Sequence, residues 1–224
     1  MQHHRTEERA MTSRTVAAVL LAAGESSRMG ESKALLPWMG KALVQFQMEQ
    51  LLEAGLRPII AVVGHEAERV QAALMPSPEA TVLLNPDYRL GKSTSIRAGV
   101  VVLPPNTSAV MILGVDQPRR ATTLKRLLDS HLAGDHLITL PTFRGQRGHP
   151  PVLSAALKSE LLSLSEERQG LREVILRHLP ETTQVPFDSQ EVLFNLNTPD
   201  DYRQALTHFQ RRTYYSSKFI PPLS

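Results

Sequence analysis

Residues 16–33 read VAAVLLAAGESSRMGESK, an apolar run that breaks into a short loop between two glycines. The run up to Ala23 has no polar side chain, which is typical of a strand covered on both faces of a parallel sheet. Gly24 ends this strand, and the small residues that follow let the backbone approach a ligand closely. Arg28 and Lys33 place two cations where a polyphosphate could lie.

The general phosphate-binding templates do not decide the role of this loop. Walker A places a lysine directly after its second glycine, whereas here Glu31 and Ser32 separate Gly30 from Lys33. The loop also misses the G-x-G-x-x-G spacing. From the residues alone, a phosphate-binding loop and an ordinary strand-to-helix turn therefore fit equally well.

The composition predicts one globular core and argues against several classes of protein. The chain has 224 residues, of which 42% are hydrophobic, enough for one sizeable core. The formal net charge is +3, and basic pairs such as Arg119-Arg120 are isolated. We therefore expect these arginines to be solvated on helix faces, and we expect no nucleic-acid partner. The lack of cysteine excludes disulfides, thiolate catalysis and cysteine-ligated metals.

The sequence also predicts where the protein resides and how it is divided. It has no apolar stretch of the ~18 residues that would suggest a membrane span, and residues 1–13 have no apolar core like that of a signal peptide. We therefore expect a cytoplasmic protein with no membrane partner. We expect residues 1–13 to be a disordered leader, residues 14–212 to form one folded domain and residues 213–224 to form a C-terminal tail.

Apolar runs alternate with helical patterns along the chain. This order predicts an α/β fold with a mostly parallel sheet and helices on both faces. Residues 141–151, rich in Gly, Pro and Arg, predict a loop. A final helix should begin near Thr198, which suits an N-cap before Pro199. The predicted strands are residues 15–23, 58–64, 81–84, 109–115, 136–140, 182–186 and 191–194, and the other predicted helices are residues 40–54, 66–74, 93–103, 122–132, 154–163 and 170–178.

Three loops follow predicted parallel strands and should meet at one edge of the sheet. Right-handed crossovers bring the carboxyl ends of such strands together, and the three loops begin at Gly24, Asn85 and Asp116. A carboxylate at Asp116 is well placed for Mg²⁺, which takes one or two carboxylates together with substrate phosphates. Its position alone, however, favours a turn or helix-capping aspartate.

Further polar groups come from two other segments and from the continuation of the Asn85 loop. Asn195 and Asn197 lie two apart, so on a strand both side chains could face the site, although an amide is a weaker ligand for Mg²⁺ than a carboxylate. Residues 85–99 lead into a helix N-terminus, whose free N–H groups suit an anion or a base carbonyl. A Ser/Thr-rich N-cap fits that segment as well. His149 could bind a substrate, accept a proton near neutral pH, or be a surface residue.

Several segments, in the same order, resemble one family. Residues 21–33, LAAGESSRMGESK, resemble the L-A-A-G-x-S-x-R-M-G-x-x-K signature of the nucleotidyltransferases that attach a nucleotide to molybdopterin. The other matching segments are residues 85–99, similar to its N-P-x-x-x-x-G-x-x-x-S loop; 114–118, GVDQP, similar to its D-Q/M-P motif; 147–153, similar to R-G-H-P-V-L-F; and 195–202, NLNTPDDY, similar to its closing motif. The resemblance runs from about residue 15 to about residue 206.

The resemblance implies a three-layer, Rossmann-like nucleotidyltransferase domain of the GT-A-like type. It implies that Arg28 and Lys33 neutralise the triphosphate and that Asp116 and Asn197 hold Mg²⁺ or Mn²⁺. A phosphate of an acceptor, bound in part by His149, would attack the α-phosphorus of a nucleoside triphosphate and expel pyrophosphate. The implied catalytic residues are Arg28, Lys33 and Asp116, and the implied nucleotide-binding residues are Leu21, Ala22, Ala23, Gly24, Arg28, Lys33, Asn85, Gly91, Ser95 and Asp116.

The implied donor is CTP and the implied acceptor is molybdopterin, with a molybdoenzyme apoprotein or a chaperone as a further partner. Ala23 favours cytidine, because the cytidylyl branch of the family reads L-A-A-G where the guanylyl branch reads L-A-G-G. Asn195 and Asn197 favour the guanylyl branch, because the cytidylyl branch usually has acids there. GTP as the donor, a sugar phosphate as the acceptor, and a nucleotide-binding partner that has lost turnover therefore remain alternatives.

Overall fold

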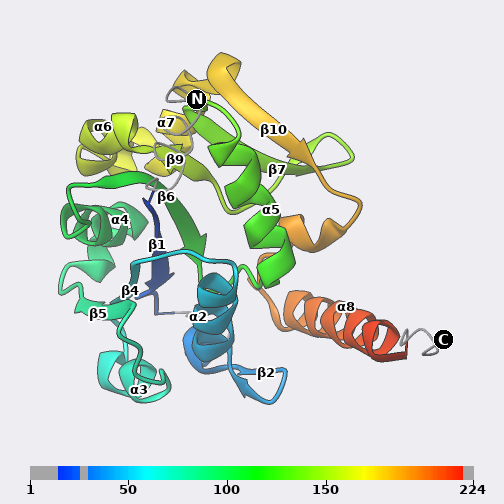
Figure 1. Cartoon of the computed structure of the whole chain (residues 1–224). Coiled ribbons are helices and arrows are strands. Elements are labelled where there is room, and N and C mark those ends of the chain that lie inside the picture. Colours follow the sequence, from blue (N-terminus) through cyan, green and yellow to red (C-terminus); the bar gives the residue numbers. More distant parts are fainter. Residues whose placement is uncertain (1–14, 26–29, 219–224) are drawn as a thin grey trace.

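The first apolar run of the sequence forms the middle of a sheet in the computed structural model (Figure 1). The structure describes residues 15–25 and 30–218. β1 (Thr15–Ala22) pairs in parallel with β4 (Ile59–Val63) on one side and with β6 (Thr107–Gly114) on the other. The carboxyl ends of these strands therefore lie at one edge, where ligand-binding loops gather in open α/β sheets.

The sheet extends to both sides of this centre. β5 (Ala80–Leu84) pairs in parallel with β4, and β9 (Val152–Ser154) runs antiparallel between β6 and β7 (Ile138–Phe143). β10 (Thr182–Pro186) pairs in parallel with β7, and β8 (Gln146–Arg147) pairs with it in antiparallel fashion. The main order is β10-β7-β9-β6-β1-β4-β5. The prediction of a mostly parallel sheet is confirmed.

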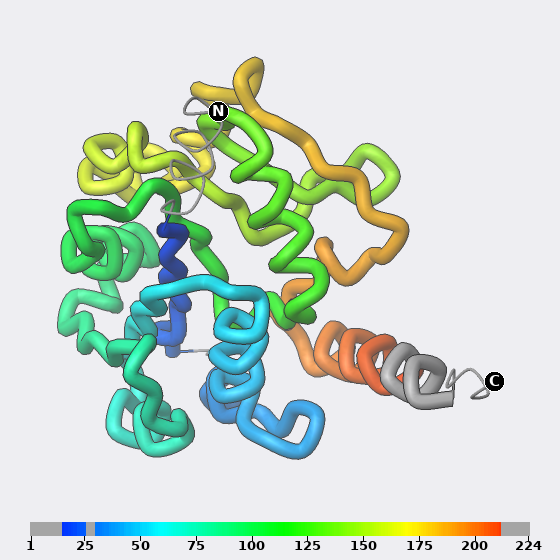
Figure 2. Tube along the Cα trace, viewed as in Figure 1, coloured from blue at the N-terminus to red at the C-terminus, as the bar shows by residue number. Residues whose placement is uncertain are grey.

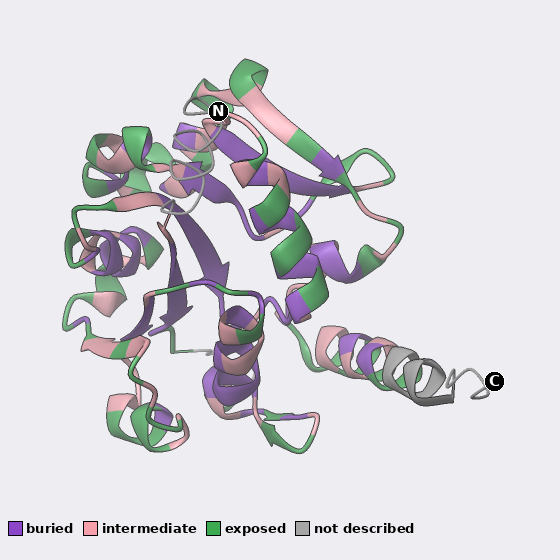
Figure 3. Cartoon of the chain, viewed as in Figure 1, coloured by how far each residue is buried: buried purple, intermediate pink, exposed green. Residues whose placement is uncertain are grey.

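Helices lie on both faces of the sheet and complete three layers (Figures 1 and 3). Successive side chains of a strand point to opposite faces, so Ala18 and Leu20 belong to one apolar core and Val19 and Leu21 to the other. This double burial explains why β1 has no polar residue after Thr15. Four helices pack into the first core: α2 (Leu43–Glu53), α3 (Ala67–Ala72), α5 (Ala121–Leu132) and α8 (Pro199–Lys218). Three pack into the second: α4 (Lys92–Val101), α6 (Lys158–Leu162) and α7 (Leu171–Arg177).

The start of α8 is fixed by a reciprocal cap. The Thr198 hydroxyl accepts a hydrogen bond from the Asp201 amide at 3.2 Å, and the Asp201 carboxylate accepts one from the Thr198 amide at 2.9 Å. This capping box confirms the predicted start of the helix. Further along, Phe209 packs edge-on against the buried Trp38, with ring centroids 5.1 Å apart. Figure 2 shows α8 leading away from the sheet, and the helix continues past residue 212, where the tail was expected to begin.

Two predicted boundaries are wrong because of short strand pairs. The predicted loop 141–151 is wrong in part, because β7 runs on to Phe143 and β8 folds back onto it through a turn at Gly145, whose φ is +79°. The helix predicted from residue 40 begins at Leu43, because β3 (Lys41–Ala42) first pairs with β2 (Pro37–Trp38).

The strand predicted at residues 191–194 is also wrong. These residues belong mostly to η6 (Gln190–Leu193), a 3₁₀ helix. The turn brings the buried Glu191 carboxylate to the Arg120 amide and guanidinium, at 2.8 and 2.7 Å. The other 3₁₀ helices are η1 (Lys33–Leu35), η2 (Tyr88–Leu90), η3 (Ala155–Leu157), η4 (Glu166–Arg168) and η5 (Leu179–Glu181).

Some predictions cannot be compared with the structure. The leader at residues 1–13 and the last six residues of the predicted tail, 219–224, lie outside the described part of the chain. Within the part that is described, no helix is long and apolar enough to cross a membrane.

Candidate active site

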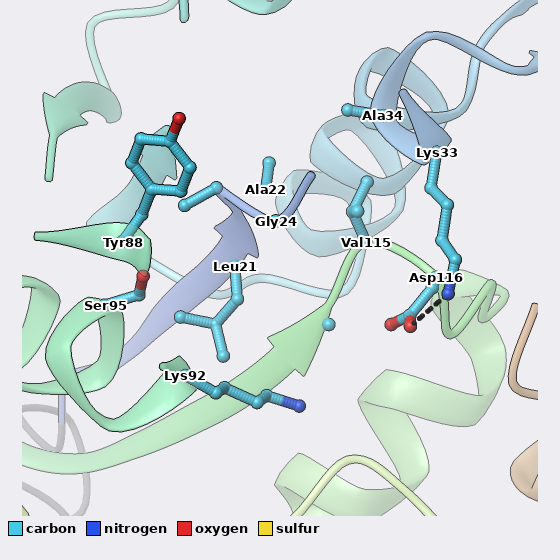
Figure 4. A pocket seen from close by; sticks show the side chains of 12 residues that line it. Leu21, Ala22, Gly24, Lys33, Ala34, Tyr88, Lys92, Ser95, Val115 and Asp116 are labelled. Carbon is cyan, nitrogen blue, oxygen red and sulfur yellow. Dashed lines mark hydrogen bonds and ion pairs between the residues drawn. The ribbon is translucent and has the colours of Figure 1, made fainter. Parts of the chain in front are cut away.

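A cavity of about 280 Å³ lies at the carboxyl ends of β1 and β6 (Figure 4). Its walls come from the loops that were predicted to meet at this edge. The predicted nucleotide-binding residues that line it are Leu21, Ala22, Ala23, Gly24, Lys33, Ser95 and Asp116. Arg28, the other predicted triphosphate-binding cation, lies outside the described residues.

Lys33 lies between the two predicted metal ligands. Its ammonium donates to an Asp116 carboxylate oxygen at 3.1 Å and to the Asn197 side-chain oxygen at 3.2 Å. The contact is largely shielded, because the Lys33 and Asp116 side chains are 13% and 26% exposed. Two oxygens from distant parts of the chain thus converge on one cation. Hard oxygen donors in this arrangement fit a divalent metal such as Mg²⁺.

The segment before α8 places only one of its two asparagines at this position. The Leu196 amide donates to the Asp116 carbonyl at 2.8 Å, and the Asn197 amide donates to the Asn195 carbonyl at 2.9 Å. The chain therefore turns here, and the expectation that both asparagine side chains share one face of a strand is wrong. Among the described residues, the buried Asn195 side-chain oxygen has no hydrogen-bond partner.

Asn85 supports the cavity from behind. It is buried and does not line the cavity, and its amide nitrogen donates to the hydroxyls of Thr94 and Ser95, each at 2.9 Å. Its side-chain oxygen accepts from the Asp87 amide at 3.0 Å. The structure therefore connects Asn85 to the cavity through Ser95, at the start of α4.

Gly91 likewise shapes the site without lining the first cavity. Its φ of +110° favours glycine, and a Cβ atom at this position would overlap the Glu166 side chain. The same carboxylate accepts a hydrogen bond from the Ser93 amide at the N-terminus of α4. Gly91 therefore allows η4 to approach the first turn of α4.

The motif patterns missed five residues that line the first cavity, namely Ala34, Tyr88, Lys92, Gly114 and Val115. Tyr88 and Lys92 occupy unspecified positions of the N-P-x-x-x-x-G-x-x-x-S pattern, so the pattern gave no signal for them. Tyr88 reaches the cavity beside Gly64, where an added Cβ would come within 2.7 Å of the tyrosine ring.

A second cavity of about 430 Å³ lies beside the first. Three cations line it, namely Lys92, Arg147 and Arg172, together with one acid, Glu166, and with His149. Its apolar wall is formed by Ile96, Ile112, Leu140, Leu171, Ile175 and Leu176. The cavity suits an anionic ligand with an apolar body, and it contains the predicted acceptor residue.

His149 is neutral in this environment. Burial is the main cause that lowers its pKa to about 4; the charges of Lys92 and Arg119 act in the same direction, and that of Asp116 acts in the opposite direction. A group with this pKa is a weak base near neutral pH. This low pKa argues against His149 as a proton acceptor in that range, whereas its neutral imidazole can hydrogen-bond a ligand.

Arg119 joins the loops of the two cavities. It is fully buried, and its guanidinium donates to the carbonyls of His149 at 2.8 Å, Val192 at 2.7 Å and Phe194 at 3.2 Å. Burial lowers its pKa to about 10, so it remains charged. The expectation that Arg119 and Arg120 are solvated on a helix face is wrong. The Arg119-Arg120 pair in the sequence does not indicate that backbone carbonyls of remote residues surround Arg119.

Residues 18–183 match the MobA-like NTP transferase domain. The chain belongs to this family. Among relatives of the MobA-like domain, it is 34% identical over 174 residues to Nicotine blue oxidoreductase of Paenarthrobacter nicotinovorans, covering 74% of this chain and 83% of the relative. It is 28% identical over 184 residues to Molybdenum cofactor cytidylyltransferase of Escherichia coli K12, covering 82% and 92%.

A solved structure agrees with this assignment. A nucleotidyl transferase from Methanothermobacter superposes on the chain with a TM-score of 0.74 at 26% identity, covering 88% of this chain and 99% of the other. The resemblance inferred from the motifs is therefore confirmed. This MobA-like domain is a nucleotidyltransferase with the expected mixed α/β fold.

Proposed function

We propose that this MobA-like domain binds CTP in the first cavity and transfers its CMP group to a phosphate of molybdopterin in the second. The observation that carries the proposal is the convergence of Lys33 and Asp116 on one wall of the first cavity. Lys33 lies in η1, the element after β1, and Asp116 comes just after β6, which pairs with β1. Both charged side chains therefore lie at the carboxyl ends of neighbouring strands.

Asp116 and Asn197 would hold Mg²⁺ or Mn²⁺, whose charge would neutralise phosphate oxygens of the nucleotide. The Lys33 ammonium lies between the same two oxygens. A triphosphate in the cavity would offer this ammonium anionic partners, and its movement onto them would release both side chains for the metal. Lys33 would then stabilise the negative charge of the phosphates.

The reaction requires little covalent chemistry from the protein, because the group passes directly between the two substrates. A phosphate oxygen of the acceptor forms a bond to the α-phosphorus, and the bond from the α-phosphorus to the β-bridging oxygen breaks. Pyrophosphate leaves with the electron pair. A phosphate monoester is largely ionised at pH 7, so no protein base is needed, in keeping with the low pKa of His149. Positioning and charge stabilisation supply the rate.

The preference for CTP is supported by Ala23 and by the relative named Molybdenum cofactor cytidylyltransferase. Ala23 is buried and lines the first cavity, so its methyl group can shape the pocket. A single methyl discriminates between ligands by only ~1–3 kcal/mol. Asn197, an amide in place of an acid, supports GTP as the alternative donor.

A direct assay tests this proposal. The protein is incubated with Mg²⁺ and each of the four nucleoside triphosphates, with and without molybdopterin, and pyrophosphate release is measured. Thermal shifts with each nucleotide are recorded in parallel, because selective binding raises the apparent stability. We expect the largest shift with CTP, and pyrophosphate release that requires both CTP and molybdopterin.

Each alternative gives a different result in this assay. Selective turnover of GTP would place the chain in the guanylyl branch, and turnover only with a sugar phosphate would change the acceptor. Selective nucleotide binding without pyrophosphate release would favour a binding partner. Because one relative is named an oxidoreductase, the same preparation is also assayed with nicotine blue and NADH or NADPH. A redox turnover faster than nucleotide transfer would overturn the proposal.

A further inference from the structure

One lysine side chain is shared by the two cavities. Lys92 lines the first cavity together with Asp116 and lines the second together with His149. Among the described residues, no other side chain lines both. Lys92 therefore stands where a nucleotide and an acceptor would meet.

The place of Lys92 in α4 is unfavourable for the helix itself. It is the first residue of α4, and the N-terminus of a helix carries partial positive charge. A cation in the first turn lacks the stabilisation of ~0.3–1 kcal/mol that an anion gains there. Helix stability thus gives no reason for a lysine at this position.

The Lys92 ammonium is available for a ligand. In the described part of the chain, no hydrogen bond or ion pair involves it, whereas Lys33 is held by Asp116 and Asn197. Figure 4 shows the Lys92 side chain extending along the cavity, with its ammonium on the side where Asp116 lies. Its charge also reaches the second cavity, since it contributes to the low pKa of His149.

From this shared position we propose that Lys92 is a catalytic residue that contacts both reacting phosphates. The proposal rests on the function proposed above. The Lys92 ammonium binds an oxygen of the α-phosphate from the first cavity and an oxygen of the acceptor's phosphate from the second. It thereby offsets the repulsion between the two anions as they approach. It exchanges no proton, and the bonds formed and broken remain those of the transfer itself.

The test compares Lys92→Met, which keeps the length of the side chain but removes its charge, with Lys92→Arg, which keeps the charge. Lys158→Met is the matched control, because Lys158 lies on α6 and lines neither cavity. CTP binding is measured by calorimetry, and kcat and KM are measured with CTP and molybdopterin.

We expect Lys92→Met to lower kcat/KM for molybdopterin by about 10- to 100-fold, the range for loss of a charge-assisted contact. CTP binding should weaken by at least about threefold. Lys92→Arg should recover much of the rate, and Lys158→Met should match the wild type. Circular dichroism and Tm confirm that all variants fold.

Two results separate this inference from the proposed function. A Lys92→Met enzyme within about twofold of the wild type for both substrates would overturn the role of Lys92 and leave the function intact. A wild type that binds CTP but transfers nothing to molybdopterin would overturn the proposed acceptor. In that case the affinity for CTP tests the role of Lys92. A threefold or greater loss of affinity in Lys92→Met supports this role, and an unchanged affinity overturns it.

Discussion

Lys33, Asp116 and Asn197 place one ammonium between two oxygens that would suit a metal ion. A cation already held in this way competes with any metal for the same oxygens. Nucleotide phosphates would relieve the competition by giving Lys33 other partners. Metal and nucleotide should therefore bind with positive coupling, each strengthening the other.

Lys33→Met should consequently have opposite effects on the two ligands. We expect CTP to bind about 10- to 100-fold more weakly, through loss of a charge-assisted contact. Mn²⁺ alone should bind more tightly, because Asp116 and Asn197 are released. Titration of free Mn²⁺ by electron paramagnetic resonance measures the second effect, with Lys41→Met as the control, since Lys41 pairs with Glu49 away from the cavity. Weaker Mn²⁺ binding in Lys33→Met would contradict this account.

Asp116→Asn should abolish pyrophosphate release at ordinary Mg²⁺ concentrations. The variant would leave a hard divalent cation with only amide and phosphate oxygens. The reverse change, Asn197→Asp, should tighten metal binding and raise activity at low Mg²⁺, because it adds a second carboxylate. Rates measured over a range of Mg²⁺ concentrations test both. Turnover of Asp116→Asn at the wild-type rate would show that Asp116 is a turn residue and not a metal ligand.

The motifs predicted the part of the site that lies at strand ends. Gly24 and Asp116 directly follow long apolar runs, so the sequence could place them together. Lys92 was missed because the loop pattern leaves its position unspecified. Arg119 was missed because its partners are backbone carbonyls, which every residue carries, and because Val192 and Phe194 are remote in the chain.

At the scale of elements, the helix–strand alternation was predictable and the short strands were not. β1 and β6 each have eight residues, and their apolar runs are unmistakable. β9 has three residues, and its place between β6 and β7 depends on pairing with distant strands. Local composition cannot specify such pairing.

The contact between η4 and α4 makes a prediction at this scale. Gly91→Ala should strain the backbone, because φ is +110° there, and should also displace Glu166. Gly145→Ala is the matched control, with φ at +79° and no described atom within 4 Å of the added Cβ. We expect a loss of about 1 kcal/mol in the control and a further ~1–3 kcal/mol in Gly91→Ala. Urea denaturation measures the free energy of unfolding of both variants. Equal losses would show that Glu166 moves aside without lowering the stability.

At the scale of the whole molecule, His149 makes stability depend on pH. Its pKa is about 4 in the fold, against an ordinary value of 6.5, through burial and the charges of Lys92 and Arg119, opposed by Asp116. The unfolded chain therefore binds more protons between these pH values, and the free energy of unfolding falls as pH is lowered from 6.5 towards 4. The largest effect is about 3 kcal/mol.

His149→Gln should remove this contribution. Urea denaturation at pH 7, 6 and 5 should give a shallower loss of stability in the variant than in the wild type, since glutamine does not titrate. Parallel losses in the two proteins would show that His149 has a similar pKa in the folded and unfolded states.

The two partners of the Lys33 ammonium lie 83 and 164 residues further along the chain. During synthesis the N-terminal residues leave the ribosome first and begin to fold before the rest is available. The Lys33–Asp116 pair can thus form while Asn197 is still inside the ribosome. The metal pair should therefore be completed last, after the residues that line both cavities have been made. A nascent chain cannot acquire its complete site until Asn197 has been translated.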